Sequence, residues 1–117
     1  MTPQEFGSAL FEIRINTHIA HLQTTSLAEH LALGDLYSKL EELQDSFTET
    51  YQGIYGVITG YPKFTTGENI DMITYLTVKC GKFTVFRNSL KEGFLQNIVD
   101  TIIELLYTTL YKLKTLN

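Results

Sequence analysis

The amino-acid sequence predicts an all-α protein, a four-helix bundle in up-down-up-down order that forms one domain over residues 1–117. Apolar residues recur at steps of three and four along most of the chain, which is the period of an amphipathic helix. Two of these segments open with a Ser/Thr-x-x-Glu sequence, at Thr2 and at Ser26, which is typical of a helix N-terminus. A chain of 117 residues is long enough for one hydrophobic core and too short for two.

The first helix is expected to begin after Thr2, which Pro3 and Glu5 follow, and to run to about Leu22. Its stripes are Phe6, Leu10, Ile13 and Thr17 in one row, and Phe11, Ile15, His18 and Leu22 in the next. Two stripes predict contacts on two sides, one with the chain's own bundle and one with a neighbouring molecule. Residues 23–25 are a short connection, which forces an antiparallel helical hairpin.

Residues 26–60 are expected to form one long helix around which the rest of the chain is organised. Its apolar stripe consists of Leu33, Leu36, Leu40, Leu43, Phe47, Tyr51, Ile54 and Ile58. Asp45 and Glu49 lie four residues apart, so they are neighbours on the helix surface and point almost opposite Phe47, away from the core. These carboxylates either belong to a solvated acidic face or form half of a site that another subunit completes.

Residues 60–67 are expected to be a loop because they contain two glycines and a proline. Residues 68–87 allow two interpretations. Apolar residues at helical spacing favour a helix, whereas the many Thr, Val, Tyr and Phe residues and a possible turn at 79–82 favour a β-hairpin. We prefer the helix because an isolated two-stranded hairpin is marginally stable.

A third helix-start sequence, from Ser89 to Glu92, precedes a last helix that is expected to run to about Leu116. The residues expected to bury one face of this helix are Phe94, Ile98, Ile102, Leu105 and Leu106. Lys112 and Lys114 suit its C-terminal end, where the helix dipole favours positive charge.

Composition limits the function and the location. The chain has 44% hydrophobic and 19% charged residues and no apolar run long enough to cross a membrane. Its start lacks the basic and apolar regions of a secretion signal. Cys80 is the single cysteine, so no internal disulfide or thiolate metal cluster is expected, and a reducing cytoplasmic location is the simplest interpretation.

The net charge of −4 is unevenly distributed. Residues 1–60 hold eight acids and two bases, and residues 61–117 hold five acids and seven bases. The acidic half favours cations, and the absence of a basic patch interleaved with aromatic residues argues against DNA as a partner. No glycine-rich phosphate loop, serine nucleophile elbow or supported Cys–His pair indicates a hydrolase or a transferase.

The chain has three histidines, His18, His21 and His30, around the first helical connection. His30 cannot reach Asp45 within one chain, because 15 residues of helix span about 22 Å. Two chains whose second helices lie antiparallel about a two-fold axis would bring histidines of one to Asp45 and Glu49 of the other. Mixed imidazole and carboxylate ligands suit iron, manganese or zinc.

The spacing His18-(11 residues)-His30-(14 residues)-Asp45-(3 residues)-Glu49 resembles the inter-subunit ferroxidase motif of the Dps-like mini-ferritins. The resemblance implies a ferritin-like fold and iron, as a di-iron or a mono-iron site, that peroxide or oxygen oxidises. It also implies a homo-oligomer for iron storage or oxidative protection, at least a two-fold dimer, with a dodecameric shell as a further option. The implied metal ligands are His18, His30, Asp45 and Glu49, with His21 and Asp35 as second-shell candidates. The residues alone also allow His21 to be a ligand or an exposed side chain.

The chain departs from the mini-ferritin pattern at two positions beside the histidines. Ile19 stands where these proteins usually have a tryptophan, and Gly34 stands where they usually have a carboxylate, with Asp35 one step out of phase. The chain is also shorter than typical members and has at most a loop where they have a short extra helix.

Other interpretations of the same residues stay open. Asp45 and Glu49 taken alone are typical of a solvated surface, and His18 lies on an apolar stripe that suits a buried, hydrogen-bonded histidine. The whole chain then fits a non-catalytic helical assembly protein, with a viral origin and association with a virion as further options. A small adaptor that binds a partner helix in its groove is a third interpretation.

Overall fold

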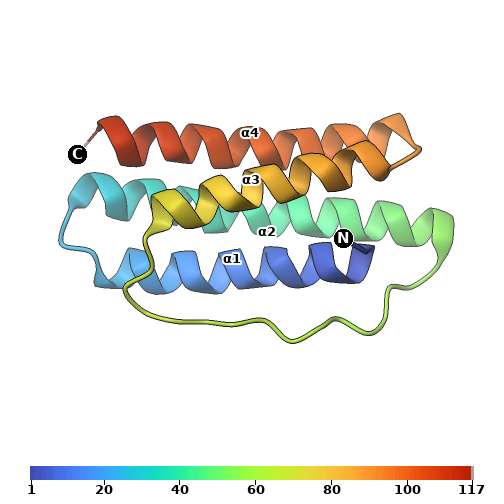
Figure 1. Ribbon diagram of the computed structural model, residues 1–117, viewed down its shortest axis with the longest axis horizontal. Coiled ribbons are helices and arrows are strands. Elements are labelled where there is room, and N and C mark those ends of the chain that lie inside the picture. Colours follow the sequence, from blue (N-terminus) through green and yellow to red (C-terminus); the bar gives the residue numbers. More distant parts are fainter. Residues whose placement is uncertain (117) are drawn as a thin grey trace.

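The computed structural model describes residues 1–116 and contains four α-helices packed as a bundle (Figure 1). The helices are α1 (Pro3–Gln23), α2 (Leu27–Tyr55), α3 (Met72–Ser89) and α4 (Gly93–Thr115). The predicted all-α, four-helix-bundle fold class is therefore confirmed, as is the helical interpretation of the region that becomes α3. Among the described residues, no helix combines the length and the apolarity needed to cross a membrane.

Local hydrogen bonds explain where the first two helices begin. The Thr2 hydroxyl accepts from the Glu5 N–H, and the Glu5 carboxylate accepts from the Thr2 N–H, so the predicted capping box of α1 is complete. At α2, the Ser26 hydroxyl accepts from the N–H of Glu29 at 3.2 Å. Both interactions satisfy backbone donors that a helix N-terminus leaves without partners.

The predicted helix start at Ser89 is wrong. Helix α3 extends through Ser89, and α4 begins after Glu92, whose side chain makes no capping bond. In the first turns of α4, Leu95 and Val99 are buried in place of the predicted Phe94 and Ile98, whereas the predicted Ile102, Leu105 and Leu106 are buried.

The predicted up-down-up-down order is also wrong, because α2 ends earlier than the apolar period indicates. It stops at Tyr55, and Gly56 follows with a φ of 93°, a conformation that favours glycine. The 16 residues between Tyr55 and Met72 can extend to about 50 Å, and the longest dimension of the molecule is 43 Å. The connection crosses over along the bundle, so α2 and α3 run in the same direction (Figure 1).

The crossover, residues 56–71, is attached to one face of α1 at four-residue intervals. The Ser8 hydroxyl donates to the Pro62 carbonyl at 2.7 Å, and the Asn16 amide donates to the Thr65 carbonyl at 3.1 Å. Between them, the Glu12 carboxylate accepts from the Thr65 N–H at 3.3 Å. These bonds satisfy backbone groups that an irregular segment lying against the protein would otherwise leave without partners.

Glu12 also joins α1 to α3, the two helices that contact each other least among the packed pairs. One carboxylate oxygen lies 2.7 Å from Lys79 Nζ and accepts a hydrogen bond of 2.7 Å from the Tyr75 hydroxyl. Burial alone would raise the pKa of Glu12, but the bonds from Lys79 and Tyr75 outweigh burial and lower it. Burial and the adjacent Glu12 carboxylate raise the pKa of Tyr75.

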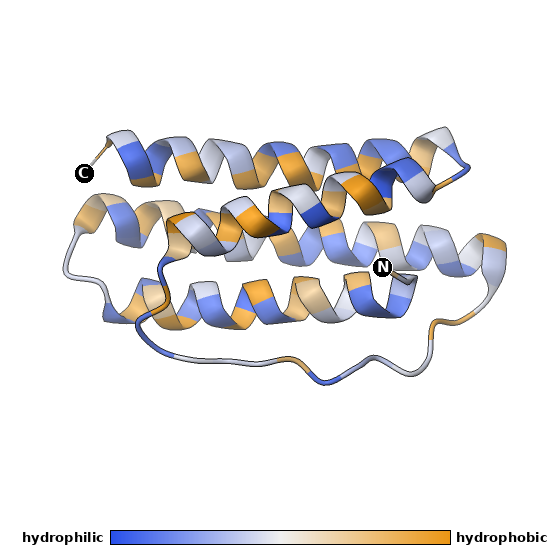
Figure 2. Cartoon of the chain, viewed as in Figure 1, coloured by the Kyte–Doolittle hydropathy of each residue, from blue (hydrophilic) through white to orange (hydrophobic). Residues whose placement is uncertain are grey.

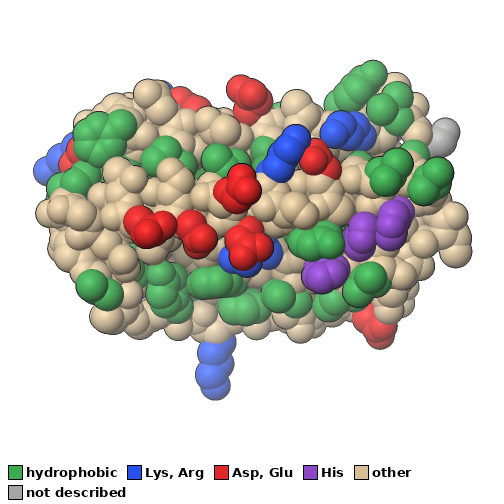
Figure 3. Space-filling view, turned by 180° about the vertical axis from the view of Figure 1, so that it is seen from behind, with side chains coloured by type: hydrophobic (Ala, Val, Ile, Leu, Met, Phe, Trp, Pro, Cys, Tyr) green, Lys and Arg blue, Asp and Glu red, His purple; other side chains and the backbone are tan. Residues whose placement is uncertain are grey.

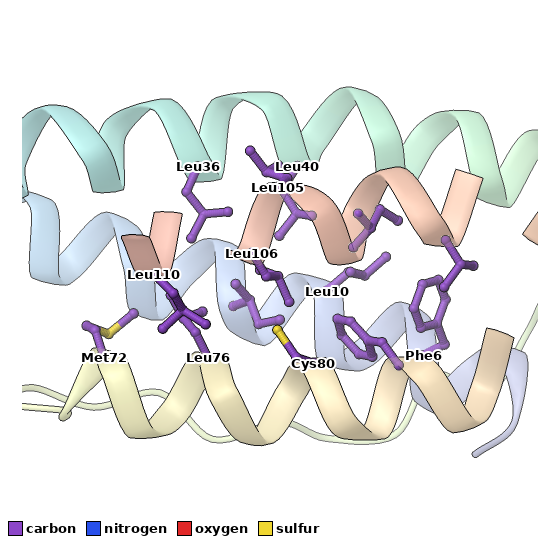
Figure 4. Packing of buried hydrophobic residues seen from close by; sticks show 14 of the residues in the cluster. Phe6, Leu10, Leu36, Leu40, Met72, Leu76, Cys80, Leu105, Leu106 and Leu110 are labelled. Carbon is purple, nitrogen blue, oxygen red and sulfur yellow. The ribbon is translucent and has the colours of Figure 1, made fainter. Parts of the chain in front are cut away.

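The core lies between all four helices, and Figure 4 shows side chains from each of them pointing inward. Phe6 is fully buried at one end, with ring centroids 4.9 Å from Phe47, 5.0 Å from Phe83 and 4.5 Å from Phe86. Apolar positions alternate with polar ones along every helix, whereas the crossover is mostly polar or neutral (Figure 2). This pattern explains why the helices build the core and the crossover lies over it.

Replacing Phe6 with alanine is expected to lower the free energy of unfolding by about 3–5 kcal/mol, because it empties the centre of the aromatic cluster. Phe94→Ala is the matched control, since Phe94 is 54% exposed and its loss should cost under about 1 kcal/mol. Denaturant unfolding followed by circular dichroism measures both. Equal losses would contradict the assigned core.

Glu12→Gln is expected to destabilise the protein by about 1–3 kcal/mol at neutral pH, since it leaves Lys79 without its anion. The pKa of Glu12 is lowered on folding, so its contribution is present above the ordinary pKa of about 4.3 and disappears as pH falls through the folded value. The difference between the two proteins should therefore narrow from about pH 5 downward. Urea unfolding at several pH values tests this, and a constant difference would contradict it.

Candidate functional site

The three histidines lie at the end of the bundle where α1 turns into α2 (Figure 3). The rings of His21 and His30 stack with centroids 3.8 Å apart and planes 17° from parallel. His18 lies farther out, with its ring centroid 6.0 Å from that of His21. The histidine that contacts His30 is therefore His21, one of the second-shell candidates from the sequence.

His21 and His30 are joined by two reciprocal hydrogen bonds. His21 Nδ1 lies 2.6 Å from the backbone oxygen of His30, and His30 Nδ1 lies 2.8 Å from the backbone oxygen of His21. A carbonyl oxygen only accepts, so Nδ1 carries the hydrogen in both rings and Nε2 is the nitrogen left for another partner. Neither Nε2 atom has a hydrogen-bond partner within residues 1–116.

His18 is held differently. Its ring stacks on that of Tyr37, with centroids 4.2 Å apart and planes 13° from parallel. It is exposed and makes no hydrogen bond to any described residue, so the interpretation of His18 as a buried, hydrogen-bonded histidine is wrong. His18 therefore has both ring nitrogens open to solvent or to another molecule.

Gly34 explains how the His21 ring comes to lie against α2. A Cβ atom at residue 34 would stand 2.8 Å from Cε1 and 3.0 Å from Nδ1 of His21, closer than real Cβ atoms approach. Any other residue at this position would push the imidazole away from the helix.

Asp45 and Glu49 are exposed on α2 and have no ion pair or hydrogen bond with any residue in the described part of the chain. Glu41, one turn before Asp45, differs, because it lies 3.6 Å from the guanidinium of Arg14. The two carboxylates named from the sequence are thus available to a ligand.

Asp35, the other second-shell candidate, is engaged elsewhere. Its carboxylate lies 3.0 Å from Lys39 Nζ and 3.6 Å from Lys112 Nζ, so it connects α2 to α4. It makes no hydrogen bond or ion pair with any of the three histidines.

The histidines and the acidic side chains lie on the same face of the molecule, with α2 along its middle (Figure 3). They remain apart within one chain, since the helix from His30 to Asp45 spans about 22 Å. Within residues 1–116, no three His, Cys, Asp or Glu side chains converge in a way that could hold a metal ion. One chain therefore presents two separate groups of donors, imidazoles at one end and carboxylates farther along.

A family model described as "Family of unknown function (DUF5856)" matches residues 21–113. The chain belongs to this family. No curated protein and no solved structure matches it. The DUF5856 match includes His21, His30, Asp45 and Glu49, whereas His18 lies before it.

The role of His21 was not apparent from sequence spacing alone. Two features of this DUF5856 chain could have indicated it. His18 and His21 are three residues apart and share a helix face, and Gly34 lies one turn after His30, where a missing side chain leaves room for a ring.

Cys80 is expected to resist thiol reagents in the folded protein. Its side chain is buried, and burial raises its pKa, so the reactive thiolate is scarce. Labelling with a chromogenic disulfide should be at least about tenfold slower in buffer than in denaturant. Val85→Cys in a Cys80→Ala background is the control, since Val85 is 69% exposed on the same helix. Equally fast labelling of the two cysteines would contradict the burial of Cys80.

Proposed function

We propose that this chain is an iron-binding protein of the mini-ferritin type that oxidises ferrous iron at sites shared between two subunits. The observation that carries the proposal is the face described above. The α1–α2 turn presents imidazoles with open nitrogens, and the exposed Asp45 and Glu49 carboxylates, which have no partner in the described residues, lie farther along α2.

Antiparallel packing of two α2 helices about a two-fold axis brings each group of imidazoles to the carboxylates of the partner. The axis passes near Ser38, which lies about midway between His30 and the Asp45–Glu49 pair. Ser38 is exposed, and its hydroxyl folds back to donate to the Gly34 carbonyl at 2.8 Å. The crossing point therefore has a short side chain, and symmetry produces two equal sites.

The donor set suits the metal. His18 and His30 of one subunit and Asp45 and Glu49 of the other supply nitrogen and oxygen ligands, a mixture that suits iron and also manganese or zinc. His30 donates its Nδ1 hydrogen to a backbone carbonyl, which is how proteins commonly fix the tautomer of a metal-binding histidine.

Ferrous iron is the substrate in this proposal. Each ferrous ion loses one electron, and hydrogen peroxide takes up two electrons with two protons to give water, so peroxide oxidises iron in pairs. Oxygen is the alternative acceptor. The acidic residues of the first half of the chain raise the local concentration of cations before oxidation.

The topology agrees with this proposal. A single long crossover between otherwise hairpin-connected helices is the connection that ferritin-like bundles use. The crossover at residues 56–71 has this form, although it carries no helix.

A second function is favoured by the apolar side chains near the histidines. Leu22, Leu27 and Leu31 are 69%, 72% and 62% exposed around the α1–α2 turn. Such side chains suit packing between subunits, so the same face fits a non-catalytic assembly protein, either as a closed shell or as a component of a larger particle. Iron oxidation separates the two functions.

Anaerobic protein is expected to bind ferrous iron and to oxidise it when peroxide is added, which ferric absorbance measures. Asp45→Ala and Glu49→Ala should each slow the oxidation by about tenfold or more, because each removes a ligand of the shared site. Glu104→Ala is the matched control, since Glu104 is an exposed acid on α4 with no partner in the described residues.

Light scattering on the same samples gives the native mass. A dimer or a larger closed particle is expected. A monomer would contradict the shared site. Equal oxidation rates in the wild type and the three variants would also contradict it, and a large particle with equal rates would favour the assembly function.

A further inference from the structure

We propose that His21 is itself a metal ligand of the shared site and holds an ion different from the one bound by His30. This inference rests on the proposed function, because it assumes that the α1–α2 face binds metal. It adds a ligand that the mini-ferritin resemblance does not include.

The hydrogen bonding of His21 matches that of His30. Both rings use Nδ1 to donate to a backbone carbonyl, at 2.6 Å and 2.8 Å, and both leave Nε2 without a partner in the described chain. Carbonyl-bound imidazoles of this kind are pre-oriented for a metal, because their tautomer and ring angle are fixed. His18 lacks such a bond and is held only by its stack on Tyr37.

The ring of His21 lies against α2 at Gly34. A Cβ built on Gly34 would lie 2.8 Å from Cε1, 3.0 Å from Nδ1 and 3.7 Å from Nε2, so Nε2 is the more distant of the two nitrogens. Gly34 thus leaves room for the His21 ring beside α2, and a larger side chain at residue 34 would move the imidazole.

The stacking of His21 on His30 determines how many ions the pair can hold. The rings are 17° from parallel with centroids 3.8 Å apart, so their in-plane lone pairs do not meet at one point. One ion cannot lie on both lone-pair directions, so each imidazole serves its own ion. Sites with two neighbouring metals are common in proteins.

A nitrogen-rich donor set defines the class of metal. Imidazole suits zinc, iron, cobalt, nickel and copper, whereas magnesium and manganese prefer oxygen ligands. With three histidines beside the partner's carboxylates, the site should prefer cobalt or zinc to manganese.

The test is titration of the full chain with Co²⁺, followed by calorimetry and by the visible absorption of the bound ion. The wild-type protein is expected to bind two ions per chain, and His21→Asn one. Asparagine can still donate to the His30 carbonyl but lacks the second nitrogen, so the variant keeps the structural contact and loses the ligand. Two ions per chain in His21→Asn would overturn the assignment.

Gly34→Ala supplies a second variant, because its Cβ displaces the His21 ring. It should weaken binding of one ion by about tenfold or more, whereas Gly53→Ala on the same helix should change nothing, since a Cβ there meets no atom within 4 Å. Thermal unfolding checks that all variants fold. Unchanged affinity in a folded Gly34→Ala protein would also contradict the proposal.

The two proposals fail in different ways. If the wild-type protein binds no Co²⁺, the shared metal site itself is wrong. If Glu49→Ala abolishes binding while His21→Asn retains two ions per chain, the shared site stands and only the role of His21 is wrong.

Discussion

The rest of the structure depends on the crossover that connects two parallel helices. Because α2 and α3 run in the same direction, residues 56–71 must return along the whole bundle, and α1 provides the surface that holds them. Ser8, Glu12 and Asn16 meet that requirement at successive turns of one helix. The same Glu12 carboxylate binds Lys79 and so joins α1 to α3, the packed pair of helices that contact each other least. The polar row on α1 therefore holds the crossover in place and also joins α1 to α3.

Much of the fold was predictable because helix-forming signals are local. The capping residues at Thr2 and Ser26 and the period of three and four placed α1 and the start of α2 correctly. The helix order was not predictable in the same way. Ile58 continues the apolar period of α2 and is buried, although it lies beyond the helix. The apolar period therefore does not indicate that α2 ends at Tyr55. The sequence therefore predicted an eight-residue loop, residues 60–67, between α2 and α3, where the structure has a connection twice as long.

Helix geometry predicted where the candidate site residues lie along α1 and α2, but not which of their side chains contact each other. Spacing placed the histidines near one turn and the carboxylates of Asp45 and Glu49 on an outward surface, and both groups are where the helix period puts them. The pairing of His21 with His30 depends on two backbone carbonyls and on the space above Gly34. Such contacts arise from the packing of α1 on α2, and residue spacing gives only indirect signs of them, such as the glycine one turn after His30. Whether two copies meet depends on a surface outside the single chain.

The α1–α2 hairpin contains every candidate ligand, and the α3–α4 hairpin contains none. The second hairpin contributes apolar surface to the core and little else to the proposed chemistry. Under the proposed function, metal binding constrains the first hairpin, whereas the outward residues of the second hairpin are free to change or to contact other partners. The two hairpins share one hydrophobic core, so in this proposal the ligand residues and the outward residues of the second hairpin can change independently while the core stays the same.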